Sequence, residues 1–76
     1  METVERFILK RIDGAYCNLK FETVKNMRSA ARFNSMEEYN QFMTGYYRPD
    51  KPELYFPQPI KVTYEEVEHE REHGNL

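Results

Sequence analysis

The segment from Ser35 to Gly45 constrains the fold most, because it predicts one short amphipathic helix. Ser35 and Glu38 form a capping box, in which the serine oxygen accepts the Glu38 N–H and the glutamate reaches back to the Ser35 N–H. Gly45 stands where a left-handed residue ends a helix. Apolar side chains recur every three or four residues, at Met36, Tyr39, Phe42, Met43 and Tyr46. A helix this short is marginal in water by itself, so we expect it to lie on a sheet.

Residues 4–24 predict a β-hairpin, with Asp13 and Gly14 as the turn signal. A two-residue turn and a three-residue loop over 12–14 are both possible, and they bury opposite faces of the hairpin. The two-residue turn would bury Arg6 and Lys10 without partners, which costs several kcal/mol for each cation. We therefore prefer the three-residue loop, with Gly14 in the left-handed conformation.

The preferred loop decides which side chains of the hairpin face inward. It pairs Leu9 with Cys17 and Phe7 with Leu19. The inner face then holds Phe7, Leu9, Ala15, Cys17, Leu19 and Phe21. The outer face holds Arg6, Ile8, Lys10, Tyr16, Asn18, Lys20 and Glu22.

Residues 24–34 and 46–64 complete the predicted sheet. Alternating apolar side chains favour a short strand over 27–33, although 28–32 are equally consistent with a helical turn. Four prolines between Pro49 and Pro59 exclude a regular helix or a central strand, so we expect 46–59 to be an extended connection. Ile60, Val62 and Tyr64 alternate with polar residues and predict a last strand beside the hairpin.

The sequence therefore predicts the α+β class, with an antiparallel sheet of three to four strands packed on one capped α-helix. We place a single domain with a thin core at residues 1–68 and a solvated acidic tail at 69–76. Cys17 is the only cysteine, and no apolar stretch has the length of a signal peptide or of a membrane span. We expect a cytoplasmic protein that does not associate with membranes.

The charge is unevenly distributed along the chain. Residues 1–34 carry seven Lys or Arg and four Asp or Glu, whereas residues 35–76 carry four and nine, for a net charge of −2. Such asymmetry can steer a charged partner. Surface elements need solvated charge in any case, so the charge alone does not assign a function.

The connection over 46–59 is the first candidate site, because long loops that carry aromatic residues are disproportionately functional. Aromatic side chains held by prolines lose little entropy on docking, which suits a protein-binding epitope. The residues predicted to bind a partner are Tyr46, Tyr47, Arg48, Leu54, Tyr55 and Phe56. The structural alternative is that Leu54 and Phe56 fold back to cover the open end of the sheet.

The outer face of the hairpin is the second candidate site. Cations for phosphates and an aromatic ring for a base fit a sheet that binds nucleic acid. The candidate residues are Arg6, Lys10, Tyr16 and Lys20. One exposed tyrosine falls short of the two or three aromatics of typical sheet readers, so a plain solvated face is the alternative.

Residues 69–73 match the H-E-x-x-H pattern of zinc metalloproteases, in which two histidines hold the metal and the glutamate activates water. The context does not match, because the segment is charged on all sides and the chain has no third histidine. We predict no catalytic metal and no cofactor, and a metal-dependent hydrolase ranks third among the possible functions. Cys17 is expected to be a buried, unreactive thiol, so we do not expect an enzyme.

Several short stretches together resemble a known group of proteins. These stretches are Phe7–Lys10, the Asp13-Gly14 turn, residues 30–39 and Ile60–Thr63. In this layout residues 5–65 resemble the small, largely uncharacterised accessory proteins encoded by phages and prophages of Gram-positive bacteria. The resemblance implies a protein that binds and inhibits a host or defence protein, and it carries over no functional residues.

These observations predict a non-catalytic protein that binds and modulates a larger protein partner. The alternative is a nucleic-acid-binding module that uses the basic face of the hairpin. Uncovered strand edges pair readily, so a homodimer through a sheet edge is a further expectation.

Overall fold

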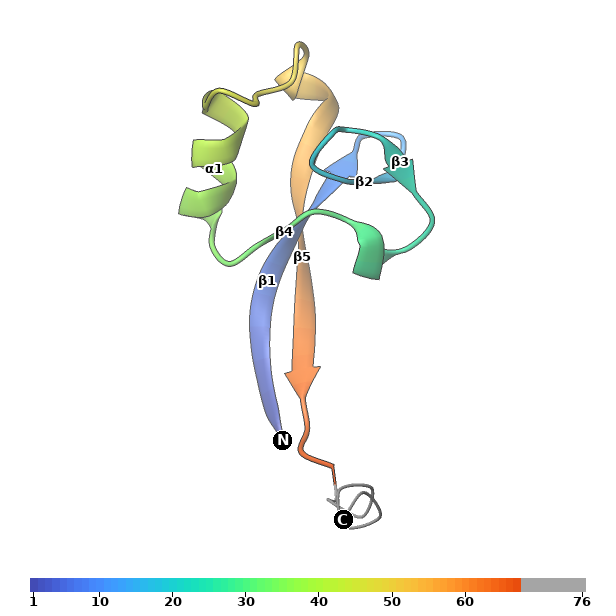
Figure 1. Cartoon of the computed structure of the whole chain (residues 1–76), viewed down its shortest axis with the longest axis vertical. Helices are drawn as coiled ribbons and strands as arrows, with labels where there is room; N and C mark the ends of the chain where they lie inside the picture. The colour runs from blue at the N-terminus through green and yellow to red at the C-terminus, as the bar shows by residue number, and fades with distance from the viewer. Residues whose placement is uncertain (68–76) are drawn as a thin grey trace, which may run out of the picture.

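The computed structural model describes residues 1–67 and confirms the α+β class (Figure 1). In this part of the chain, five antiparallel strands form one curled sheet, with one α-helix and two 3-10 turns. The strands are β1 (Glu2–Arg11), β2 (Tyr16–Cys17), β3 (Thr23–Val24), β4 (Arg32–Phe33) and β5 (Tyr55–Tyr64). The helix is α1 (Met36–Thr44), and the 3-10 turns are η1 (Met27–Ser29) and η2 (Pro52–Leu54).

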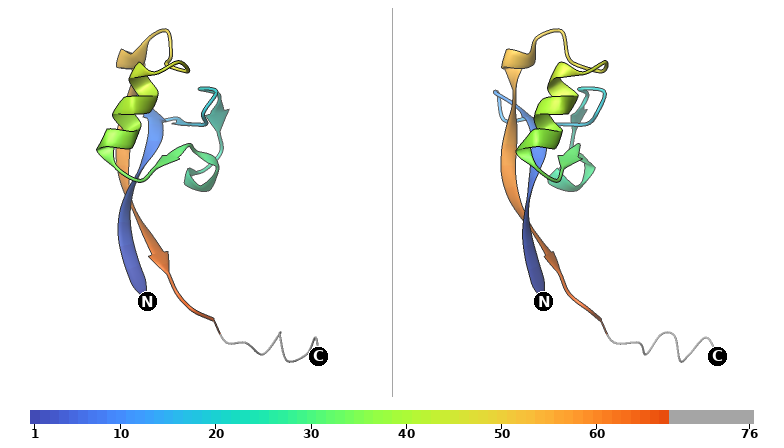
Figure 2. Two further views of the ribbon diagram at one scale, coloured as in Figure 1. Left: turned by 60° about the vertical axis from the view of Figure 1, so that its left-hand side comes forward. Right: turned by 90° about the vertical axis from the view of Figure 1, so that its left-hand side faces the viewer.

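The sheet is built on β1. Along one edge β1 pairs with β5 over its whole length, from Glu2 opposite Tyr64 to Arg11 opposite Tyr55. Along the other edge it pairs with β2 near its C-terminal end and with β4 in its middle, and β3 adds to β2. The part of β1 before Phe7 therefore pairs with β5 alone. This two-stranded ribbon extends away from the rest of the fold (Figure 1, Figure 2).

The loop between β1 and β2 has the predicted three-residue form. Lys10 lies opposite Tyr16, which is the preferred register. The Arg11 N–H donates to the Ala15 carbonyl at 2.8 Å and closes the loop. Gly14 has a φ of +96°, in the left-handed region that favours glycine.

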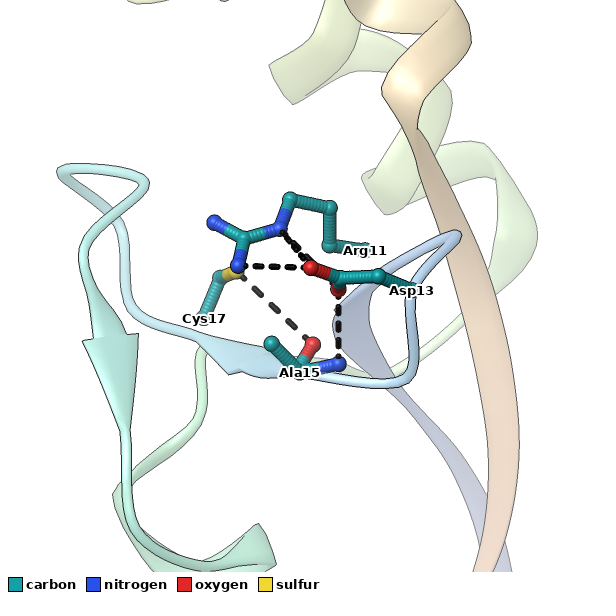
Figure 3. A network of polar contacts seen from close by, with 4 residues as sticks. All are labelled: Arg11, Asp13, Ala15 and Cys17. Carbon is teal, nitrogen blue, oxygen red and sulfur yellow. Dashed lines mark hydrogen bonds and ion pairs between the residues drawn. The ribbon is translucent and has the colours of Figure 1, made fainter.

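Asp13 holds this loop together (Figure 3). Its carboxylate accepts hydrogen bonds from the Arg11 guanidinium at 2.9 and 3.0 Å and from the Ala15 N–H at 3.1 Å. The Arg11 hydrogen bond, followed by that from Ala15, holds the pKa of Asp13 below its usual value. The turn thus depends on an ion pair as well as on the glycine.

The second strand of the hairpin is shorter than predicted. β2 ends at Cys17, because the Asn18 side chain accepts two N–H groups from the following residues, at 2.9 and 3.0 Å, and turns the chain. Leu19, which we expected on the inner face opposite Phe7, is exposed instead, and β4 pairs with Phe7. Phe21 does reach the core, at the cost of a strained φ of +63°.

Ile8 lies on the predicted outer face but is completely buried, so the prediction that it faces solvent was wrong. Arg32 and Gln58 lie directly opposite Ile8 on the two neighbouring strands. Opposite residues share a face of the sheet, and the stems of these long side chains can shield an apolar residue between them. A sequence pattern describes the side chains of one strand and contains no information on shielding by side chains of the neighbouring strands.

Residues 24–34 contain both of the structures that the sequence left open. Met27–Ser29 forms η1, whose start is capped by the Asn26 side chain, which accepts the Ser29 N–H at 3.0 Å. Arg32–Phe33 forms β4. The alternation predicted over 27–33 holds only at its end, where Phe33 is buried and Arg32 is exposed.

The expected connection over 46–59 was wrong for residues 55–59, which belong to β5. The exclusion of a central strand holds, because within residues 1–67 β5 pairs with β1 alone. The Ile12 N–H donates to the Leu54 carbonyl at 2.9 Å. In this register the backbone groups of even-numbered residues form the hydrogen bonds between β1 and β5, and the backbone N–H positions of odd-numbered residues of β5 point away from β1. Pro57 and Pro59 are odd-numbered, and within residues 1–67 β5 is an edge strand. The ladder loses no hydrogen bond at either proline. A second copy that paired with the outer edge of β5 would find no backbone N–H donor at Pro57 or Pro59.

α1 covers one face of the sheet and closes the core (Figure 2). The Ser35 hydroxyl accepts the Glu38 N–H at 3.2 Å as predicted, whereas the Glu38 carboxylate accepts the Asn34 N–H at 3.4 Å instead of that of Ser35. The buried core comprises Leu9, Cys17, Ala31, Phe33, Tyr39 and Met43. Around it pack Phe7, Phe21, Phe42 and Tyr55.

The end of α1 differs from the expectation. Gly45 has a φ of −89° and is not left-handed. A Cβ at this position would lie 2.8 Å from the Gln41 carbonyl oxygen, so a close approach to the backbone favours glycine here. Tyr46, predicted to extend the apolar stripe, lies beyond the last helical residue, Thr44, and points into solvent.

Candidate functional site

Three exposed apolar side chains lie close together, because Leu19 and Tyr47 line one hollow and the Tyr46 ring packs on the Tyr47 ring. Tyr46 is 89% exposed, Tyr47 72% and Leu19 57%. The Tyr46 and Tyr47 rings pack edge to face, with centroids 5.0 Å apart. We call Leu19, Tyr46, Tyr47 and Arg48 the aromatic end.

Hydrogen bonds order the backbone of the aromatic end. The Arg48 N–H and the Arg48 guanidinium both donate to the Gly45 carbonyl, at 3.2 and 3.1 Å. The ring of Pro49, directly after Arg48, fixes the φ of Pro49 itself. Leu19 and Tyr47 line a hollow of about 590 Å³, whose lining also includes Lys20, Asp50 and Lys51.

The structure divides the six residues predicted to form one epitope. The first three, Tyr46, Tyr47 and Arg48, are exposed. Tyr55 packs on Phe21, with ring centroids 5.0 Å apart, at the margin of the core, and Leu54 is half-buried in the same hollow. Phe56 lies opposite Lys10, on the sheet face away from α1. Leu19 also belongs to this surface. It was not among the predicted residues, because the sequence analysis placed it on the inner face of the hairpin.

The sheet face away from α1 carries a groove of about 990 Å³. Its cationic lining residues are Lys10, Arg28, Arg32 and Lys61, and within residues 1–67 no Asp or Glu lines it. By strand alternation Lys61 directs its side chain to the opposite face of β5 from Ile60 and Val62. Tyr16 also lines it, and its ring centroid lies 5.2 Å from the Lys10 ammonium, within the range of a cation–π contact. We call this surface, with apolar Ile60 and Val62, the basic groove.

Three of the four residues predicted for a nucleic-acid-binding face share the face of this groove. Lys10 and Tyr16 line the groove, and Arg6 lies opposite Ile60 on the same side of the sheet. Lys20 does not belong to it, because β2 stops before this residue and the following turn carries Lys20 to the aromatic end.

Sequence reasoning missed Arg28, Arg32 and Phe56 as residues of this face. The two arginines lie in the segment whose structure remained open, and Phe56 lies in the stretch assigned to a connection. Phe56 and Tyr16 are the direct partners of Lys10 on the two neighbouring strands, so the three side chains form one row. The apolar alternation of Ile60, Val62 and Tyr64 was the available signal. Extended towards the N-terminus in steps of two, it reaches Phe56 and places it on the same face.

Cys17 is the one cysteine of the sequence, and the structure places it in the core. Its side chain is completely buried, the thiol lies 3.8 Å from the Ala15 carbonyl oxygen, and burial raises the pKa of the thiol. Within residues 1–67, no three His, Cys, Asp or Glu side chains are grouped so that they could hold a metal ion. The H-E-x-x-H residues, from His69 to His73, lie outside the described residues.

We expect native Cys17 to react with a thiol reagent at least about a hundredfold more slowly than the same thiol in urea. Both burial and the raised pKa reduce the thiolate that a reagent can reach. Release of thionitrobenzoate at mildly alkaline pH measures the two rates. Equal rates in native buffer and in urea would contradict the buried position.

Within residues 1–67 no helix is long and apolar enough to cross a membrane, and α1 has nine residues. Comparison of the chain with protein-family models, curated proteins and solved structures finds no match.

Proposed function

We propose that this protein is a non-catalytic accessory protein that binds a larger protein and modulates its activity, with the aromatic end as its epitope. The observation that carries the proposal is the joint exposure of Leu19, Tyr46 and Tyr47. A domain this small has little apolar surface to spare for its core, so three large apolar side chains left in solvent at one place favour a binding role.

The chemistry of the aromatic end suits a protein interface. Tyrosine and arginine are enriched among the residues that carry most of the binding energy in such interfaces. The hydrogen bonds from Arg48 to Gly45 restrain the turn before binding, which reduces the entropy lost on docking. Lys20, Asp50 and Lys51 beside the apolar side chains supply the polar rim of a typical interface.

Inhibition of a host or defence protein is the form of modulation that the resemblance to phage-encoded accessory proteins favours. An inhibitor of this kind needs no reactive group and only has to occupy a functional cleft of its target. The segment after α1 and the loop after β2, which carry the aromatic end, lie away from the free end of the β1–β5 ribbon (Figure 1). The aromatic end can therefore enter a cleft of the partner without a collision between the partner and the β1–β5 ribbon.

Affinity capture from bacterial lysate tests the proposal, followed by measurement of the dissociation constant for any captured protein. We expect a Tyr46→Ser, Tyr47→Ser double variant to bind at least about a hundredfold more weakly, because two exposed anchors together contribute about 3 kcal/mol. Its circular dichroism should stay unchanged, since neither residue belongs to the core.

Tyr64→Ser is the matched control. Tyr64 is 49% exposed, but it lies at the end of β5, in the ribbon. We expect this variant to bind the partner with unchanged affinity. If the double variant retained every captured protein, or if Tyr64→Ser weakened binding equally, the aromatic end would not be the epitope.

A further inference from the structure

We infer that the basic groove, with Arg6 and Phe56 at its margins, binds single-stranded nucleic acid. This site lies on the sheet face away from α1 and does not depend on the proposed role of the aromatic end. Three features of the groove carry the inference: cations without carboxylate partners, two aromatic rings that flank Lys10, and an apolar floor.

The cations of this face have no carboxylate partners in the part of the chain that the structure describes. They are Arg6, Lys10, Arg28 and Arg32. Within residues 1–67 the single ion pair joins Arg11 and Asp13, in the loop between β1 and β2. Like charges gathered on a concave face raise the local potential and attract a polyanion, whose binding releases counterions.

The two aromatic rings are placed to receive bases. Tyr16 and Phe56 are half-buried, and each lies directly opposite Lys10, on either side of β1. They are therefore separated by two strand spacings, about 10 Å. Bases splayed out from a single strand can stack on both rings while the intervening phosphate lies over Lys10. The bases of a duplex are paired and stacked on each other, so a duplex cannot use these rings.

The rest of the groove suits sugars and base edges. Met27, Ile60 and Val62 provide apolar surface, and Gln58 provides an amide that can both donate and accept hydrogen bonds. The negative net charge of the chain does not oppose the inference, because five glutamates follow Tyr64. Residues 1–64 carry ten Lys or Arg and eight Asp or Glu.

Fluorescence anisotropy with labelled oligothymidylate and oligouridylate of about 16 nucleotides tests the inference with the full chain. We expect saturable binding at low salt. The logarithm of the association constant should fall with the logarithm of salt concentration with a slope of about −3, because each of the four cations contributes about 0.7 on a single strand. A duplex of the same length should bind at least about tenfold more weakly.

Substitutions distinguish the contribution of charge to oligonucleotide affinity from the contribution of base stacking. Arg28→Ala and Arg32→Ala, both at exposed side chains, should each weaken binding about tenfold and reduce the salt slope by about 0.7. Tyr16→Leu should weaken binding about tenfold at an unchanged slope, because it removes a stacking platform and no charge. Lys51→Ala is the matched control, since Lys51 lines the hollow at the aromatic end and does not line the groove. It should change the affinity less than about twofold.

The inference is overturned if neither oligonucleotide binds at low salt, or if Lys51→Ala weakens binding as much as Arg32→Ala does. It is also overturned if polyglutamate competes as well as an unlabelled oligonucleotide while Tyr16→Leu has no effect, because the groove would then accept any acidic polymer. The Tyr46→Ser, Tyr47→Ser variant should keep its affinity for the oligonucleotides. This result distinguishes failure of the groove from failure of the aromatic end.

Discussion

Replacing Leu9 by Ala is expected to lower the free energy of unfolding by about 3 kcal/mol, a large part of the stability of a small domain. Leu9 is completely buried in the core between the sheet and α1. Its N–H donates to the Ala31 carbonyl at 3.0 Å, which holds the backbone in place and limits collapse around the cavity. Urea unfolding followed by circular dichroism measures the change.

Leu19→Ala is the matched control, because it removes the same atoms from a leucine that is 57% exposed. We expect it to change the free energy of unfolding by no more than about 0.5 kcal/mol. The pair tests the structure against the sequence pattern, which places both leucines on one inner face. Equal losses from the two substitutions would mean that the hairpin continues past Cys17 as the pattern predicts.

Gln58→Pro is expected to cost about 3 kcal/mol or more, although Gln58 stands between two native prolines. Gln58 lies opposite Ile8, and this pair belongs to the even-numbered set that bonds across the β1–β5 ladder. A proline there removes an inward N–H and places its ring against β1. The measurement is again urea unfolding.

Lys61→Pro provides the comparison, because odd-numbered residues of β5 direct their N–H groups outward. We expect a loss of no more than about 1 kcal/mol, since no hydrogen bond of the sheet is removed. If position 61 tolerated proline less well than position 58, the register between β1 and β5 would have to shift by one residue. Such a shift would also exchange the two faces of the ribbon and move Phe56 away from Lys10.

Local signals in the sequence determined the parts of the fold that depend on neighbouring residues. The three-residue loop followed from Asp13-Gly14 together with the cost of burying Arg6 and Lys10, and the start of α1 followed from Ser35. In each case the deciding interaction spans only a few residues, such as the hydrogen bond from the Glu38 N–H to Ser35 at 3.2 Å. A short sequence window contains all the groups that such an interaction needs.

The tertiary structure alone decided which strands are neighbours, and with them both candidate surfaces. Phe56 and Lys10 are far apart in the sequence and become partners because Pro57 and Pro59 fall on the outward positions of an edge strand. Leu19 is exposed because Asn18 ends β2 early. A sequence pattern records the period of one strand, whereas the choice of partner strand depends on the packing of the whole chain. The fold class was therefore predictable from the residues, and the composition of each candidate surface was not.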